Sequence, residues 1–264
     1  MKYAFWNTRK NQIEDYIFSL IVDNGVNVVV LAEYNETSVM NLTERVGFHL
    51  ITCAGCDHIS ILSDRSDFEM GPQNSHYSIQ IVGNDYLLCC LHLASSLFQG
   101  ASARREIEID ALCNDLKSIT ETSGLSEVVF VGDFNEDPYS KNILNVGRFH
   151  ALPSFGDLEN EFRTVEGFSF RKFYNPMWNL MGDKNCVPGT FYFSNSPDPE
   201  ESYWHMLDQV IISKGLKTRF DVNKLEIITK TSQGPLKNDK GIPDKAISDH
   251  FPIVFEIGDR YERV

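Results

Sequence analysis

The sequence predicts a mixed α/β protein in which strands and helices are interleaved. Over residues 1–150, short apolar runs alternate with amphipathic or polar stretches, and several runs are joined by short turns. Three stretches repeat apolar residues at the 3.6-residue period of a helix, and many more have the length of a buried strand. This pattern indicates a mixed sheet core covered by helices. Two sheets packed face to face with helices outside accommodate it, although periodicity alone does not select them over other α/β folds.

The first quarter of the chain predicts two helices among short strands. The first helix, at residues 11–22, places Ile13, Ile17, Leu20 and Ile21 on one face. The second helix is expected at residues 37–46. The accompanying strands are short and rich in apolar residues, and we expect them at residues 2–6, 27–31, 48–53 and 58–63.

The rest of the chain continues this pattern. The turn signal Gly83-Asn84-Asp85 separates two apolar runs, so we expect a hairpin of residues 77–82 and 86–93. Residues 103–120 carry the longest helical pattern. Further strands are expected at residues 127–131, 189–193, 207–212, 225–229 and 252–257. Because no repeat, low-complexity tract or flexible linker divides the chain, we interpret residues 1–264 as a single domain.

The composition is that of an ordinary globular protein, with 42% hydrophobic and 23% charged residues in a chain of 264. Lys and Arg number 24 against 37 Asp and Glu, which gives a formal net charge of −13. This charge excludes a protein that coats DNA or RNA through a basic face. It does not exclude an enzyme acting on phosphate esters, because such a site needs carboxylates to hold a metal ion.

The apolar runs and the cysteines favour a cytoplasmic protein. No run approaches the roughly 20 residues of a membrane helix, and the first residues lack the pattern of a signal peptide. Cys89 and Cys90 are adjacent in a predicted strand, which suits reduced core thiols. Cys53 and Cys56 have C-x-x-C spacing, but no second pair of ligands at zinc spacing follows them, so we expect a structural role.

Isolated polar residues lie where the predicted strands end. They come from six distant places in the sequence: Asn7, Glu33, His92, Asp133 with Asn135, Asp208, and Asp249 with His250. Taken singly, each is more often a turn, cap or surface residue. Strand ends can converge on one edge of a sheet system, so together these residues predict a site of carboxylates, amides and imidazoles. Oxygen ligands from Glu33 and Asp249, helped by Asn7, suit Mg²⁺ or Mn²⁺.

The residues around these positions form a series of six motifs. They are Trp6-Asn7, Leu31-Ala32-Glu33, His92-Leu93-Ala94-Ser95, Gly132-Asp133-Phe134-Asn135, Leu207-Asp208-Gln209-Val210 and Ser248-Asp249-His250-Phe251-Pro252. In this order the series resembles the endonuclease/exonuclease/phosphatase superfamily with its DNase I-like fold, and it spans residues 6–252. The resemblance implies a four-layer α/β sandwich of two packed mixed β-sheets flanked by helices.

The resemblance also implies an activity, the hydrolysis of a phosphoester by water with the help of Mg²⁺ or Mn²⁺. Glu33, with Asn7 and Asp249 beside it, would hold the metal. The substrate implied is DNA or RNA, and the enzyme a nuclease. The alternatives are a phosphatase or phosphodiesterase acting on a small or lipid-linked phosphate, an enzyme like the tyrosyl–DNA phosphodiesterases, and an inactive relative retained as a binding module.

Five further residues have catalytic roles by the same resemblance. Asp133 would orient and deprotonate the attacking water, and Asn135 would donate a hydrogen bond to the phosphate. His250, oriented by Asp208, would donate to a non-bridging oxygen, and His92 would supply a second donor or an acid. The division of acid and base roles among these groups stays open.

Substrate specificity is expected in the loops, because the motif residues are shared across the superfamily. The segment 152–205 interleaves aromatic and basic residues, as in Phe170-Arg171-Lys172-Phe173-Tyr174, which suits phosphate contact and base stacking. We expect most of its aromatics in the core and one or two of Phe173, Tyr174 and Trp178 at the substrate groove. Arg104 and Arg105, at the start of a helix, are expected near an anionic substrate.

Overall fold

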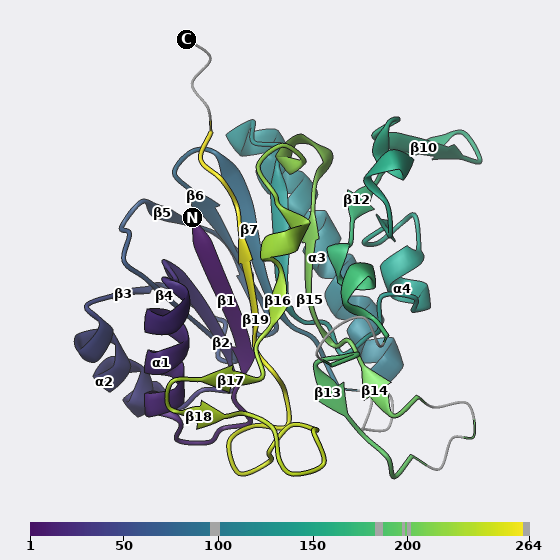
Figure 1. The fold of residues 1–264 in the computed structure, drawn as a ribbon. Coiled ribbons are helices and arrows are strands. Elements are labelled where there is room, and N and C mark those ends of the chain that lie inside the picture. The colour runs from purple at the N-terminus through teal and green to yellow at the C-terminus, as the bar shows by residue number, and fades with distance from the viewer. Residues whose placement is uncertain (96–100, 183–186, 197–198, 200–201, 261–264) are drawn as a thin grey trace.

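A computed structural model describes residues 1–95, 101–182, 187–196, 199 and 202–260, without the side chains of residues 36, 37 and 101. Two large mixed sheets lie face to face with helices on their outer sides (Figure 1). The predicted four-layer α/β sandwich is confirmed. Among the described residues, no helix is both long and apolar enough to cross a membrane.

The first sheet has the strand order β16-β19-β1-β2-β4-β3. Its members are β1 (Lys2–Asn7), β2 (Val28–Ala32), β3 (His49–Ile51), β4 (Ile59–Ser63), β16 (Glu226–Ile227) and β19 (Ile253–Glu256). β1 and β2 are parallel, and the other neighbours are antiparallel. The helices α1 (Glu14–Asn24) and α2 (Glu36–Val46) cover its outer face.

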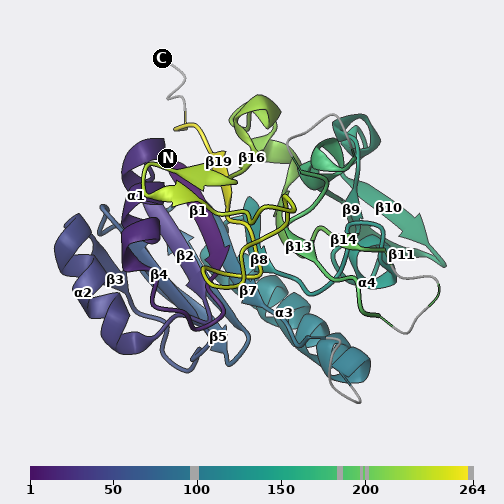
Figure 2. The same cartoon turned by 60° about the horizontal axis from the view of Figure 1, so that its bottom comes forward.

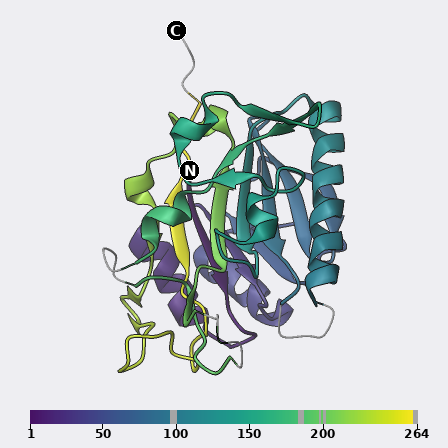
Figure 3. The same ribbon diagram turned by 90° about the vertical axis from the view of Figure 1, so that its right-hand side faces the viewer.

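The second sheet has the order β5-β6-β7-β8-β15-β12-β9. Its members are β5 (Phe68–Asn74), β6 (Tyr77–Val82), β7 (Tyr86–His92), β8 (Val128–Asp133), β9 (Ala151–Leu152), β12 (Phe173–Tyr174) and β15 (Asp208–Ile212). The long helix α3 (Ala101–Ser123) runs along its outer face, as Figure 3 shows. The predicted hairpin of residues 77–82 and 86–93 is the β6–β7 pair.

Short elements complete the chain. A hairpin of β10 (Phe162–Val165) and β11 (Phe168–Arg171) projects from the body of the molecule (Figure 2). The remaining elements are α4 (Lys141–Leu144), β13 (Phe191–Tyr192), β14 (Trp204–His205), β17 (Lys230–Thr231), β18 (Gly234–Pro235) and the 3₁₀ turns η1 (Phe155–Leu158), η2 (Pro176–Leu180), η3 (Lys214–Leu216) and η4 (Val222–Lys224).

Three buried clusters fill the spaces between the four layers. Successive residues of a strand point to opposite faces of its sheet. Tyr3 and Phe5 of β1 therefore pack between the sheets, whereas Ala4 and Trp6 pack under the outer helices. Both faces of the central strands are covered, which explains why β2 is a continuous apolar run. The strand ends, where this core stops, are the places left for polar side chains.

Candidate active site

Three of the predicted residues form a row across neighbouring strands of the second sheet. His92 ends β7 and pairs in register with Asp133, which ends β8, and Asp133 pairs with Asp208 at the start of β15. Paired residues on adjacent strands carry their side chains on the same face of the sheet, about 5 Å apart. The strand register therefore places these side chains beside one another without help from a loop.

Gly132 makes this row possible. A Cβ atom on Gly132 would lie 2.1 Å from the backbone oxygen of Leu91 in the neighbouring strand β7. Its φ of 156° is also one that residues with a side chain rarely adopt. The close approach of β7 and β8 explains why glycine precedes Asp133.

The first sheet contributes Asn7 and Glu33 from the ends of two parallel strands. Asn7 ends β1 opposite Ala32 in β2, and Glu33 follows Ala32 directly. Glu33 has a left-handed backbone with φ of 53°, which is uncommon for a residue other than glycine and is typical of functional sites. The Thr8 hydroxyl donates to the backbone oxygen of Glu33 at 2.8 Å and holds this turn in place.

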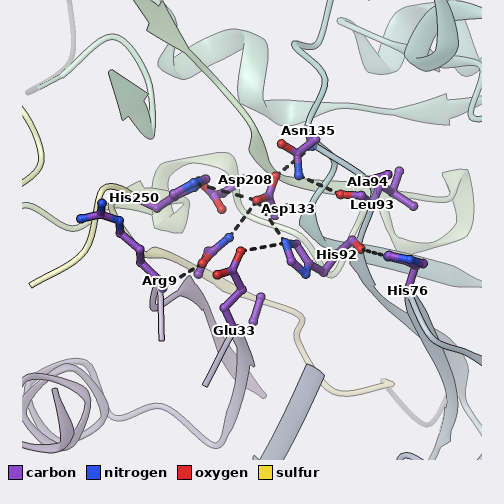
Figure 4. Close-up of polar contacts among 12 residues, drawn as sticks. Arg9, Glu33, His76, His92, Leu93, Ala94, Asp133, Asn135, Asp208 and His250 are labelled. Atoms are coloured by element: carbon purple, nitrogen blue, oxygen red, sulfur yellow. Dashed lines mark hydrogen bonds and ion pairs between the residues drawn. The ribbon is translucent and has the colours of Figure 1, made fainter. Parts of the chain in front are cut away.

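Asp133 lies at the centre of the site (Figure 4). Its side chain is almost fully buried, and each of its oxygens has a fixed donor. Oδ2 accepts from Asn7 Nδ2 at 3.0 Å, and Oδ1 accepts from the backbone N–H of Asn135 at 2.8 Å. The Nε2 atoms of His92 and His250 lie 3.9 and 4.0 Å from Oδ2. A carboxylate so held cannot rotate away from its neighbours.

His250 and Asp208 form a buried pair beside Asp133. His250 Nδ1 donates to Asp208 Oδ2 at 2.8 Å, since an ionised carboxylate can only accept. Burial alone would lower the pKa of His250, but Asp208 and then Asp133 raise this pKa to about 10. Burial raises the pKa of Asp208, against the effect of the neighbouring imidazole. His250 therefore carries its proton at neutral pH.

His92 and Glu33 form the opposite side of the site. His92 Nε2 lies 3.4 Å from Glu33 Oε1. The hydrogen bond from His92 lowers the pKa of Glu33 to about 2 despite partial burial, so Glu33 is ionised at neutral pH. Burial acts to lower the pKa of His92, but Glu33 and Asp133 outweigh it and raise this pKa. His76 Nδ1 contacts the backbone oxygen of His92 at 2.9 Å and fixes the end of β7.

Asn135 and Arg105 support the loops behind the row. Asn135 has a left-handed φ of 49°, and its Nδ2 donates to the backbone oxygen of Leu93 at 2.8 Å. Its predicted contact with the phosphate stays a prediction. Arg105 donates to the backbone oxygens of Asn135 and Ala94 at 2.7 and 2.8 Å and is only 5% exposed. The expectation that Arg105 faces an anionic substrate is therefore wrong, whereas the side chain of Arg104 is 66% exposed.

Asp249 is held by a residue that the sequence analysis did not single out. Its carboxylate Oδ2 lies 3.2 Å from Nε of Arg9. Arg9 comes two residues after Asn7, and its backbone N–H donates to Asn7 Oδ1 at 3.0 Å. In the sequence, the one sign that Arg9 belongs to the site is its position two residues after Asn7.

The aromatic residues expected at the substrate groove are mostly elsewhere. Phe173 and Tyr174 form β12 and are buried in the core, so the expectation that one or two of the three line the groove now depends on Trp178. Trp178 is partly buried, with its ring centre 6.4 Å from that of Tyr139. Phe191 of β13 packs against the site, with its ring centre 4.9 Å from that of His250.

One group of described residues could hold a metal ion. The ligand atoms of Asp133, Asp208 and His250 all lie within 4.8 Å of one another. This set differs from the predicted metal ligands Asn7, Glu33 and Asp249, which stay a prediction. Because the raised pKa of His250 keeps the imidazole protonated at neutral pH, a cation would have to displace that proton to bind there.

The sheet order and the flanking helices define a DNase I-like fold. Solved structures share it over nearly their whole length. An AP endonuclease from Archaeoglobus fulgidus matches with a TM-score of 0.61 and 13% identity, covering 97% of this chain and 99% of that one. The 3′ phosphatase NExo from Neisseria, bound to a product DNA hairpin, matches with a TM-score of 0.62 and 12% identity, covering 98% and 100%.

A humanized D. rerio TDP2 matches with a TM-score of 0.60 and 16% identity, covering 98% of this chain and 99% of that one. No family model and no curated protein matches the sequence. At identities this low, the similarity establishes the fold, and the function has to be argued from the site.

Proposed function

We propose that the protein is a Mg²⁺-dependent phosphodiesterase, a nuclease acting on DNA or RNA. The observation that carries this proposal is the buried Asp133 carboxylate. It is oriented by Asn7 and Asn135 and lies within 4.0 Å of the imidazoles of His92 and His250. Phosphoester hydrolysis needs a group that orients and deprotonates water, and donors for the charge that develops on phosphate. This arrangement offers both.

Asp133 is the base of the proposed reaction. Its two oxygens are fixed by the donors from Asn7 and Asn135, so their free lone pairs have a defined direction. His250 retains a proton on Nε2 at neutral pH and turns it toward the Asp133 side of the site. That proton is placed to donate to a non-bridging oxygen of a phosphate while Asp133 holds the water.

The donor atoms on the Glu33 side fit a hard divalent cation. Glu33 remains ionised at neutral pH, and the amide oxygen of Asn7 and the carboxylate of Asp249 come from adjoining segments. Mg²⁺ prefers such oxygen ligands and usually keeps several waters. We therefore assign the ion to Glu33, Asn7 and Asp249 rather than to the group that contains the protonated His250. When bound, the ion neutralises charge on the phosphoryl oxygens.

The similar structures support this substrate class. By name they are an AP endonuclease, a 3′ phosphatase bound to a DNA hairpin, and a TDP2. The net charge of −13 suits turnover of a nucleic acid rather than tight coating of it. Residues 1–264 acting as one domain, and a cytoplasmic location, are part of the proposal.

The test is a substrate panel. The purified protein is incubated with single-stranded DNA, duplex DNA, RNA, 5′-tyrosyl DNA and a phosphoinositide, each with Mg²⁺ and with EDTA. We expect Mg²⁺-dependent cleavage of a nucleic-acid substrate. Asp133→Asn should lower turnover by about 1,000-fold while leaving the circular dichroism spectrum unchanged.

Asp64→Asn is the matched control, because Asp64 follows β4 at the opposite end of the first sheet from Glu33. It should remain fully active. Cleavage of the phosphoinositide alone would contradict the nucleic-acid substrate and support the lipid-phosphate alternative. If Asp133→Asn were as active as the wild type, the site assignment itself would be wrong.

A further inference from the structure

Arg9 is tied to the site through its backbone. It follows β1 in a left-handed turn, with φ of 54° at Arg9 and 60° at Lys10. The backbone N–H of Arg9 donates to Asn7 Oδ1 at 3.0 Å, and that of Lys10 donates to the backbone oxygen of Glu33 at 2.8 Å. Two consecutive left-handed residues are unfavourable without glycine, so the surrounding contacts must hold them. The turn therefore ties the backbone at Arg9 and Lys10 to two predicted metal ligands, Asn7 and Glu33.

The guanidinium of Arg9 forms an ion pair with Asp249, the third predicted metal ligand. Its Nε lies 3.2 Å from Asp249 Oδ2, and its Nη1 donates to the backbone oxygen of Lys245 at 3.1 Å. Figure 4 draws Arg9 on the His250 side of the site. The side chains of Arg9 and Asp249 are 46% and 21% exposed. An ion pair so open to water is only weakly stabilising, so another ion can displace either partner.

The charges around the Arg9–Asp249 ion pair indicate which ions compete with each partner. Four carboxylates line the site, from Glu33, Asp133, Asp208 and Asp249, and the imidazoles of His92 and His250 lie among the first three. Arg9 is an exposed cation that pairs with Asp249. A divalent ion competes for the Asp249 carboxylate, and an arriving phosphate competes for the guanidinium, whose planar fork matches phosphate oxygens.

We propose that Arg9 is an exchangeable counter-ion of Asp249 and the phosphate-binding residue at the mouth of the site. Without a metal ion, the guanidinium of Arg9 pairs with the carboxylate of Asp249. When a divalent cation takes that carboxylate, the guanidinium is released to bind a phosphate oxygen of the substrate. The first half of this inference rests on the metal site proposed above at Asp249, and the second half rests also on the proposed phosphate substrate; the competition between Arg9 and a metal ion is measurable without that substrate.

The first experiment measures metal binding in the absence of substrate. Calorimetric titration of the protein with MnCl₂ should give about fivefold tighter binding for Arg9→Ala than for the wild type, because a weak competing ion pair is removed. Arg9→Lys should lie between them. Arg45→Ala is the matched control, since Arg45 forms a similarly exposed pair with Asp15 away from the site, and its Mn²⁺ affinity should equal that of the wild type.

The second experiment measures steady-state kinetics on the substrate found in the panel. Arg9→Ala should raise KM about tenfold, from the loss of a charged hydrogen bond, with kcat within about twofold of the wild type. Unchanged or weaker Mn²⁺ binding in Arg9→Ala overturns the counter-ion role. An unchanged KM overturns the phosphate contact. If the wild type hydrolyses nothing, the proposed function fails, while the Mn²⁺ titration still decides the role of Arg9 at Asp249.

Discussion

The side chain of Asn7 donates from Nδ2 to Oδ2 of Asp133 at 3.0 Å, and this bond joins the functional ends of the two sheets. Asn7 ends β1 in the first sheet, and Asp133 ends β8 in the second. The backbone oxygen of Asn7 also accepts from the Ser248 hydroxyl at 2.6 Å, which fixes the segment that carries Asp249 and His250. Asn7 thus connects residues of both sheets through its side-chain amide, and the C-terminal motif through its backbone oxygen.

Removing the side-chain amide of Asn7 should lower activity more than it lowers stability. Asn7→Ala leaves a buried oxygen of Asp133 without its side-chain donor, which costs about 1–3 kcal/mol of the free energy of unfolding. We expect kcat to fall about 100-fold, because Oδ2 of Asp133 then loses the donor that fixes its position. Urea unfolding and steady-state kinetics measure the two effects. Asn223→Ala, which removes an exposed amide bonded to Asp221, should change neither. An unchanged kcat in Asn7→Ala would contradict the positioning role.

The pH dependence of His250 is set by Asp208. A pKa raised from 6.5 to about 10 means that the proton stabilises the folded state, with the full contribution below pH 6.5 and its loss as the pH rises through 10. Asp208→Asn removes the carboxylate that raises this pKa, so the imidazole should titrate well below 10, and activity at pH 8 should fall relative to pH 6. NMR titration of the His250 resonances measures the pKa of His250 in the wild type and in Asp208→Asn. An equal pKa in these two proteins would show that Asp208 does not raise it.

Divalent metal should stabilise the folded protein through Glu33. A ligand at about 100 times its Kd adds about 3 kcal/mol to the free energy of unfolding. We expect Mg²⁺ to raise the Tm of the wild type and of the control Glu121→Gln, whose side chain is exposed on α3, but not the Tm of Glu33→Gln. EDTA should abolish the activity. If Asp208→Asn loses the stabilisation and Glu33→Gln keeps it, the ion instead lies at the group formed by Asp133, Asp208 and His250.

Gly132 should tolerate no side chain. A Cβ atom 2.1 Å from the Leu91 oxygen forces β7 and β8 apart, so Gly132→Ala should lower the free energy of unfolding by about 4 kcal/mol or more. Gly147→Ala is the comparison, since its added Cβ would come no nearer than 3.5 Å to another atom, and it should change stability by less than about 1 kcal/mol. Thermal unfolding measures both, and a Gly132→Ala protein of normal stability would refute this reading of the motif.

Much of this fold could be predicted because its central strands have strong local signals. β1, β2, β7 and β8 are apolar runs bounded by turns, and their polar ends predicted which edge of the sheets carries the site. The turn signal at Gly83-Asn84-Asp85 likewise predicted the β6–β7 hairpin. Such strands can be predicted from their own residues, because a buried strand needs apolar side chains on both faces whichever strands lie beside it.

The parts that could not be predicted depend on distant contacts. β5 is an edge strand with a bulge between Met70 and Gln73, and Gly71-Pro72 within it reads as a turn, although proline is tolerated at such edges. The two-residue strand β12 is too short for periodicity, so its aromatics could not be assigned to the core. The contact of Arg9 with Asp249 joins the two ends of the chain, and no pattern in either segment reveals it.

The register that aligns His92, Asp133 and Asp208 has a consequence for how this protein can diverge. These residues are spaced by the hydrogen-bonded ladder, whereas Phe191, Arg9 and the β10–β11 hairpin belong to segments outside the two main sheets. Insertions and substitutions in those outer segments leave the ladder spacing intact. Changes in those segments can therefore alter what the proposed site binds while the spacing of His92, Asp133 and Asp208 is kept.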